Sequence, residues 1–178
     1  MTHLATVAGA LGVAANCVWP LLGGRRQILA MQVFACMMFA LHYRMLGAGT
    51  GSAMCLVGAL QALISASLRS TWARRGAFGA ALAASLAITA ATWSGLPSGL
   101  ALCGQSMGAL GRLQRSEQAI RLSFLGSEMF WTAHNTVVGS SWGLTSDAMS
   151  VTMLLIGLWR GRPTRKLCPA YAGIPAVR

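Results

Sequence analysis

The sequence predicts an all-α membrane protein with seven transmembrane helices. Of its 178 residues, 55% are hydrophobic and only 10% are charged, and the mean hydropathy is +0.59. Soluble domains of this length carry about 25% charged residues. Apolar runs of about 20 residues, long enough to cross a hydrocarbon layer of ~30 Å, follow one another along the chain. Basic residues lie mainly between these runs, as is typical of membrane proteins.

Short connections separate the seven apolar runs. In order, they are Arg25-Arg26, GAGTG, the stretch from Arg69 to Arg75, SGLPS, Arg112 to Arg115, and GSSWG. The first run has no Lys or Arg before it, so we interpret it as a retained span and not as a signal peptide. The fifth is short and interrupted by glycines, which leaves open six spans plus a re-entrant segment. The predicted spans are Leu4–Leu22, Gln27–Leu46, Gly51–Leu68, Gly76–Trp93, Pro97–Leu110, Gln118–Val138 and Gly143–Trp159.

The basic residues predict the orientation. With seven spans, twelve of the fourteen fall on one side, and the opposite connections GAGTG, SGLPS and GSSWG hold none, with Arg44 near that surface. Positive charge stays cytoplasmic, so we expect the N-terminus outside and the C-terminus inside. Dropping the fifth span would place positive loops on both sides, which favours seven. The twelve are Arg25, Arg26, Arg69, Arg74, Arg75, Arg112, Arg115, Arg160, Arg162, Arg165, Lys166 and Arg178.

Several function classes are disfavoured. The net charge is +11, but the basic residues lie between apolar segments and do not line one face. We therefore expect contact with the lipid bilayer and not with nucleic acid. The five cysteines show no CxxC spacing, and we predict no metal site, disulfide framework or cofactor. GQSMG, residues 104–108, matches the hydrolase pattern G-x-S-x-G, but a transmembrane helix lacks the strand-to-helix turn that this motif requires. We therefore predict close helix packing there and no enzyme.

The second and sixth spans end in a similar pattern. At an offset of 92 residues, His42 aligns with His134, Gly47 with Gly139, and Phe39 with Trp131. Four crossings separate the two copies, so both point the same way. This predicts two parallel repeats of three helices, about residues 4–68 and 97–159, joined by a linker helix at about 76–93. A basic cytoplasmic tail, 160–178, follows and is predicted to be disordered or surface-associated.

Two runs carry a resemblance to a known family. GGRRQILAMQVFACMMFALHYRMLGAG and EQAIRLSFLGSEMFWTAHNTVVGSSWG resemble the YgjV-type bacterial inner-membrane proteins, over about residues 8 to 160. That family is similar to the SWEET, SemiSWEET and PQ-loop transporters. The resemblance implies a 3+1+3 bundle in the bacterial inner membrane, with a path for small polar solutes between two triple-helix bundles. The chain departs from the SWEET pattern because Pro20 is followed by LLGGRRQ and the fifth span has no internal proline.

Glu128 is the sharpest candidate for chemistry. It lies in the middle of the sixth span, where an unpaired carboxylate is costly, so it is either protonated or paired. Arg121, two turns earlier on the same face, either reaches toward this carboxylate or extends to the cytoplasmic surface. Two roles stay open for Glu128: proton coupling or solute contact, and a packing hydrogen bond made by a neutral carboxyl.

His42 and His134 lie about one turn from the outer ends of their spans. One interpretation is a symmetric pair that faces a shared central path, where an imidazole binds a polar solute or responds to pH. The other is that each ring hydrogen-bonds a backbone carbonyl in the next loop and locks the turn. Repetition at equal spacing does not separate these interpretations.

Three further residues complete the candidate set. Asn135 is a plausible solute contact, because its amide both donates and accepts hydrogen bonds. Trp131 either stacks on a ring-shaped solute or anchors the interface, whereas Trp142 is predicted to be an interfacial anchor. Asp147 is expected to cap the seventh span or to pair with Arg44, and capping is preferred.

The sequence supports two candidate functions. The first is a transporter-like inner-membrane protein whose central polar path binds a small solute through His42, Glu128, Trp131, His134 and Asn135. Lacking a nucleotide-binding motif, it would work by facilitated or ion-coupled movement. The alternative is a non-transporting scaffold or assembly protein that retains the fold. The sequence does not name a substrate, and assembly into homo-oligomers is left open.

Overall fold

Seven α-helices joined by short loops make up residues 3–161, the part of the chain that the computed structural model describes, and no strand occurs there. The predicted tail lies outside these residues, apart from Arg160. The helices are α1 (His3–Val18), α2 (Arg25–Met45), α3 (Gly49–Ser67), α4 (Thr71–Ala91), α5 (Leu96–Leu113), α6 (Glu117–Val138) and α7 (Ser141–Arg160), with a short 3-10 turn, η1 (Trp19–Leu21), after α1.

Each predicted span corresponds to one helix, with two instructive differences. α5 runs unbroken from Leu96 to Leu113, although glycines were expected to interrupt it. α4 begins at Thr71, so Arg74 and Arg75 belong to the helix and not to the preceding loop, as we had expected. Pro20 lacks an amide hydrogen and cannot continue α1, which explains the 3-10 turn at the end of the first span.

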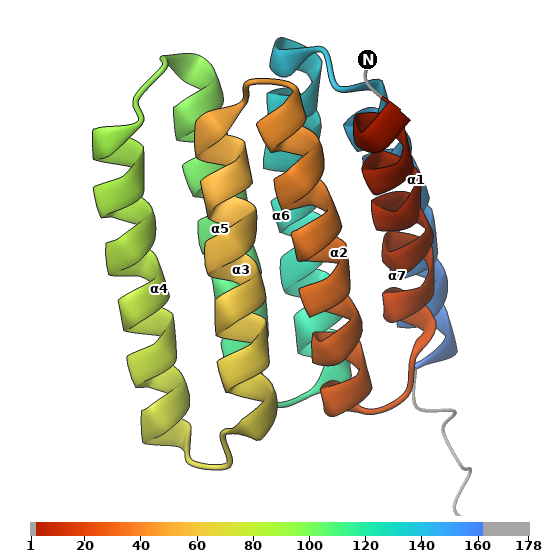
Figure 1. Cartoon of the computed structure of the whole chain (residues 1–178). Coiled ribbons are helices and arrows are strands. Elements are labelled where there is room, and N and C mark those ends of the chain that lie inside the picture. The colour runs from red at the N-terminus through yellow and green to blue at the C-terminus, as the bar shows by residue number, and fades with distance from the viewer. Residues whose placement is uncertain (1–2, 162–178) are drawn as a thin grey trace, which may run out of the picture.

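The helices form two layers with a seventh helix at one side. Figure 1 shows α1, α2 and α3 side by side in front of α7, α6 and α5, while α4 stands at the edge. Contacts join α1 to α2, α2 to α3, α3 to α5, α5 to α6, α6 to α7, and α7 back to α1. α4 packs against α3 and α5. Six helices therefore enclose a central space, and α4 lies outside it.

Turn residues set the C-terminal ends of the two middle helices. Gly47 after α2 and Gly139 after α6 have φ values of 76° and 67°, a backbone region that favours glycine. Ser140 then caps α7, because its hydroxyl accepts a hydrogen bond from the Gly143 amide at 2.9 Å. Asp147 was expected to form this cap, and that prediction is wrong: Asp147 lies two turns into α7, beyond the first turn where free amides occur.

Polarity is inverted relative to a soluble bundle. Large apolar side chains on the outside are exposed, including Leu4, Leu60, Leu86 and Leu122, whereas many polar side chains are buried. By length and composition, three of the described helices suit a membrane crossing: His3–Leu21, Arg25–Met45 and Gly49–Ser67.

Two apolar clusters lie along the axis of the bundle. Trp19, Ile28, Ile120, Phe124 and Leu154 form one, near the ends of the bundle where α2 and α6 begin. Phe39, Ala40, Tyr43 and Cys55 form the other, toward the opposite end, with Trp131 packed against it. The space between the two clusters is where the polar residues gather.

Candidate functional site

A cavity of about 80 Å³ lies inside the six enclosing helices. A space of about 10–15 Å³ on this measure holds one water, so there is room for several waters or a small solute. Its wall is drawn from every helix except α4. The lining residues are Asn16, Trp19, Gln32, Ala35, Cys36, Phe39, Tyr43, Cys55, Gly104, Gln105, Gly108, Arg112, Phe124, Ser127, Glu128, Trp131, Ser146 and Asp147.

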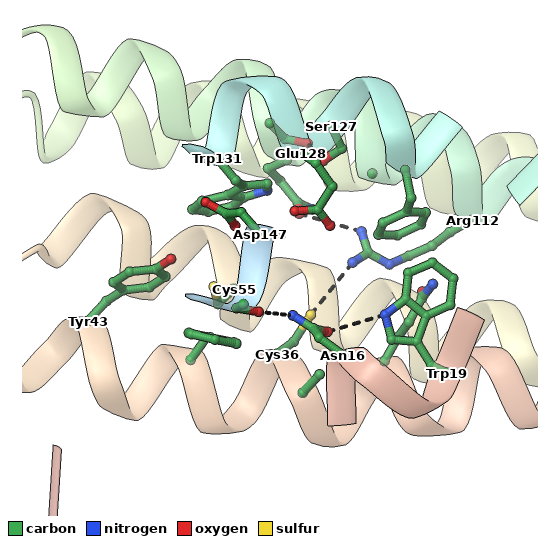
Figure 2. Close-up of a pocket in the computed structure, with 18 residues that line it drawn as sticks. Asn16, Trp19, Cys36, Tyr43, Cys55, Arg112, Ser127, Glu128, Trp131 and Asp147 are labelled. Atoms are coloured by element: carbon green, nitrogen blue, oxygen red, sulfur yellow. Dashed lines mark hydrogen bonds between the residues drawn. The ribbon is translucent and has the colours of Figure 1, made fainter. Parts of the chain in front are cut away.

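Arg112 places a buried cation on this cavity. Its side chain is 3% exposed, and Figure 2 shows the guanidinium on the same cavity as Glu128 and Asp147. Its hydrogen-bond partners are neutral and distant: Gln61 Oε1 and Gln105 Oε1 at 3.5 Å, and Cys36 Sγ at 3.6 Å. Among residues 3–161, no carboxylate oxygen lies within 4 Å of it. The charge is therefore buried without a close counter-ion.

Glu128 and Asp147 place two carboxyl groups on the same cavity. They are 7% and 6% exposed, and their carboxyls lie next to each other. Asp147 Oδ2 accepts a hydrogen bond from Asn135 Nδ2 at 2.9 Å, and Asn135 Oδ1 accepts one from the Tyr43 hydroxyl at 2.7 Å. Adjacent carboxylates repel each other in a low-dielectric interior, so a proton or a cation between them is stabilising.

Two glutamines on the cavity wall have unused hydrogen-bonding capacity. Gln32 is 2% exposed, and neither its Oε1 nor its Nε2 has a partner within the described structure. Gln105 is 3% exposed, and its Nε2 is also unpartnered there. Leaving a buried polar group unpaired costs about 1–3 kcal/mol. Waters or a polar ligand in the cavity would remove this cost.

Aromatic rings line the side of the cavity near the C-terminal ends of α2 and α6. Tyr43 and Trp131 stack with ring centroids 5.9 Å apart and an angle of 7° between their planes. Trp131 lies against Gly104, where a Cβ atom would be only 2.8 Å from the indole nitrogen. Phe39 packs in the same way on Gly12, at 2.7 Å. Trp131 thus forms part of the cavity wall.

The two histidines lie beside the cavity and do not line it. His42 Nδ1 is 2.9 Å from the carbonyl oxygen of Ala5, and its Nε2 is 3.0 Å from Ser140 Oγ. His134 Nδ1 is 2.9 Å from the carbonyl oxygen of Pro97. Each ring therefore contacts a backbone carbonyl at the start of a neighbouring helix, and not in the following loop. Of the five predicted site residues, Glu128 and Trp131 line the cavity. Asn135 does not line it but hydrogen-bonds two residues that do, Tyr43 and Asp147.

Arg121 lies away from Glu128. Its Nε and Nη2 donate to the carbonyl oxygens of Pro20 and Leu22 at 2.8 Å, and Nη2 is 3.7 Å from Glu117 Oε2. Of the two alternatives for Arg121, the reach toward the Glu128 carboxyl is excluded, because the carbonyls after α1 accept hydrogen bonds from this guanidinium. Trp142, expected in an interfacial loop, lies in α7 and packs on Gly9 of α1.

Sequence reasoning missed four polar residues of the cavity: Arg112, Asp147, Gln32 and Gln105. Arg112 was counted as a loop charge because the fifth span was ended at Leu110, but α5 continues to Leu113. Gln32 and Gln105 lie within predicted spans, and a polar residue there is itself a signal for a buried site. No group of three His, Cys, Asp or Glu side chains within residues 3–161 is arranged to hold a metal ion.

Residues 3–165 match the Imp-YgjV family of bacterial inner membrane proteins. The chain belongs to this family. No curated protein and no solved structure matches it. An Imp-YgjV protein resides in the bacterial inner membrane, and the apolar exterior of this bundle suits contact with the lipid bilayer.

Proposed function

We propose that this Imp-YgjV protein is transporter-like and carries a small polar solute through the central cavity. The observation that supports this most is the set of charged and unpartnered polar groups at the centre of a bundle whose exterior is apolar. Intramembrane ionisable residues are costly, and they typically mark solute or ion pathways. Arg112, Glu128 and Asp147 are the groups that would contact the solute.

The proposal includes a 3+1+3 architecture of two parallel repeats joined by α4. Several features recur at an offset of 92 residues. His42 contacts the Ala5 carbonyl, and His134 contacts the Pro97 carbonyl, each 37 residues back. The outer turns at Gly47 and Gly139 both have positive φ. Phe39 on Gly12 and Trp131 on Gly104 are likewise matched contacts. These equivalences support a duplication, while kinship with SWEET and PQ-loop transporters stays a hypothesis.

Aromatic pairs lie toward both ends of this path. Tyr43 and Trp131 line the cavity on one side, and Trp19 and Phe124, with ring centroids 5.0 Å apart, line it on the other. Alternate opening of these two aromatic pairs would expose the solute to each side in turn. The paired carboxyls of Glu128 and Asp147 suit ion coupling, because they gain or lose a proton as a unit. We propose no enzymatic role for GQSMG, since it lies within α5.

Native cysteines offer the test of a wet path. Cys36 and Cys55 line the cavity, whereas Cys103 is exposed on the outside of α5 and serves as the matched control. Three variants would each keep one of these thiols and carry serine at the other cysteines. We expect a membrane-impermeant methanethiosulfonate reagent, applied to membrane vesicles, to modify Cys36 and Cys55 over time but not Cys103, which would face lipid.

The same experiment separates the two candidate functions. Modification of the cavity thiols from either face of the membrane means that water reaches the polar centre. If neither Cys36 nor Cys55 reacts in vesicles of either orientation, the centre is sealed and the transporter proposal fails. The scaffold or assembly function would then be preferred, because a bundle whose centre is sealed from water can bind partners only at its surface.

A further inference from the structure

The cavity brings together one basic and two acidic side chains that form no ion pair with one another. Arg112 contributes a guanidinium from α5, and Glu128 and Asp147 contribute carboxyls from α6 and α7. All three are at least nine-tenths buried, yet the only ion pair within the described residues joins Arg121 to Glu117. A buried charge that lacks a close counter-ion costs several kcal/mol. The arrangement therefore suits a ligand that supplies both missing partners.

Donors with free capacity surround the cation. Arg112 Nε and Gln105 Nε2 have no hydrogen-bond partner in the described structure, and the three hydrogen bonds of the guanidinium are all 3.5 Å or longer. Gln32, on the opposite layer, adds a donor and an acceptor that are both unused. Guanidinium groups bind carboxylates with two parallel hydrogen bonds. This end of the cavity is thus suited to a carboxylate.

Glu128 and Asp147 supply carboxyl oxygens as acceptors on this side of the cavity. Asn135 accepts from the Tyr43 hydroxyl and donates to Asp147, and Glu128 lies close to Asp147 and Ser150. Trp131 and Tyr43, which stack on each other, line the same cavity. Carboxylates and aromatic faces both attract ammonium groups. This side is thus suited to an amine.

We propose that the cavity binds a small zwitterion, a solute of the α-amino-acid class, with its carboxylate on Arg112 and its ammonium on the Glu128–Asp147 pair. The inference rests on the proposed function and names its solute. A simple anion would leave the carboxyl pair without a cation, and a simple cation would leave Arg112 unpaired. A zwitterion satisfies both without bringing net charge into the membrane, which is the larger cost. A volume of about 80 Å³ restricts the solute to a small side chain.

Matched ligands make the test specific. The purified full-length protein would be heated with glycine, L-alanine or L-serine, with their amides as cations, and with glycolate, lactate or glycerate as anions, at equal ionic strength. We expect at least one zwitterion to raise the apparent Tm, because a ligand that binds only the folded state stabilises it. Its amide and its hydroxy acid, which each keep one charge, should give no shift at the same concentration.

Variants then locate the two ends of the ligand. Arg112→Gln should weaken zwitterion binding at least about tenfold, the loss expected for one charge-assisted interaction. Arg112→Lys, which keeps the charge, should lose less and guards against a folding defect. Glu128→Gln should weaken binding as well, whereas Arg75→Gln, an exposed charge on α4, should leave it unchanged.

Each other outcome overturns the proposal. Equal shifts with the hydroxy acids identify an anion site at Arg112, and equal shifts with the amides identify a cation site at the carboxyl pair. If no zwitterion shifts the Tm while Cys36 and Cys55 react with the aqueous thiol reagent, the path exists but the solute class is wrong. If the thiols are also unreactive, the proposed function itself has failed.

Discussion

At the scale of single residues, glycines decide how closely aromatic rings approach the neighbouring helices. Phe39 and Trp131 lie over Gly12 and Gly104, where any Cβ atom would be less than 3 Å from a ring. The sequence showed the aromatic positions and their spacing but not their glycine partners, because those contacts join helices far apart in the chain. Close helix packing had been predicted for residues 104–108, and the structure shows that the partner of Gly104 is the Trp131 indole.

Replacing Gly104 with alanine should destabilise the protein. The added methyl group would overlap the Trp131 ring, and overpacking of this kind costs about 1–3 kcal/mol. Gly99→Ala in the same helix is the control, since the nearest atom is 3.7 Å away and alanine favours helix formation. The effect of each substitution is measured as the change in the free energy of unfolding in mixed micelles. A cost for Gly104→Ala no larger than that for Gly99→Ala would show that Trp131 moves freely.

The two histidines should differ in their contribution to stability, even though they occupy matched positions. Both are almost fully buried, so His42→Ala and His134→Ala remove similar packing. His42 makes two hydrogen bonds, to Ala5 and Ser140, whereas His134 makes one and keeps Nε2 unpartnered within the described structure. We expect His42→Ala to cost about 1 kcal/mol more, measured as the free energy of unfolding. Equal losses of stability would mean that the hydrogen bond between His42 and Ser140 does not stabilise the protein.

At the scale of helices, most of the fold was predictable because the chain alternates apolar runs with basic or glycine-rich connections. The ends of the helices were harder to place. Ser70 caps α4, so this helix begins at Thr71, ahead of Arg74 and Arg75. Arg112 falls inside α5, because an arginine can stay helical while its guanidinium finds polar partners inside the bundle. Counting Arg112 as a loop charge was consistent with the predicted orientation but concealed the cation of the cavity.

Arg25 joins three helices and should not tolerate replacement by lysine. Its guanidinium donates to the carbonyl oxygens of Ser65, Arg112 and Gln114 at 2.8, 2.9 and 3.0 Å, the last residues of α3 and α5 and the loop beyond. Lysine keeps the positive charge but cannot reproduce this fork of three guanidinium hydrogen bonds. We expect Arg25→Lys to lower the free energy of unfolding by about 2 kcal/mol or more.

The neighbouring Arg26 provides the control for this prediction, because it is exposed and no hydrogen bond of its side chain is recorded within residues 3–161. Arg26→Lys should therefore be neutral. Hydrogen exchange offers a second measurement: the backbone amides at the ends of α3 and α5 should exchange faster in Arg25→Lys alone. If both substitutions behave alike, the fork does not hold these helices together.

At the scale of the whole molecule, the polar centre could be predicted only in part. Glu128 and Trp131 were found because each is unusual within its own span, and that needs no knowledge of neighbours. The residues that interact with Glu128 come from α7, and no local pattern indicates which faces of six helices point inward together. Asp147 illustrates this limit, because its position near a helix start suggested a cap while its side chain lies on the cavity.

The whole bundle also carries a charge asymmetry that predicts its orientation. Figure 1 shows the loops after α1, α3 and α5 and the end of α7 at one end of the molecule, and Arg25, Arg69, Arg115 and Arg160 lie at that end. Since positive loops stay in the cytoplasm, we expect this end inside and the N-terminal end of α1 outside.

Reporter fusions test this orientation together with the number of spans. Alkaline phosphatase, which is active only outside the cytoplasm, should be active when fused after Gly95 and inactive when fused after Ser70 or Ser116. A green fluorescent protein at the C-terminus should fluoresce. An active phosphatase after Ser116 would mean that α5 does not cross the membrane. The basic loops would then lie on both sides, and the two halves could not be parallel repeats.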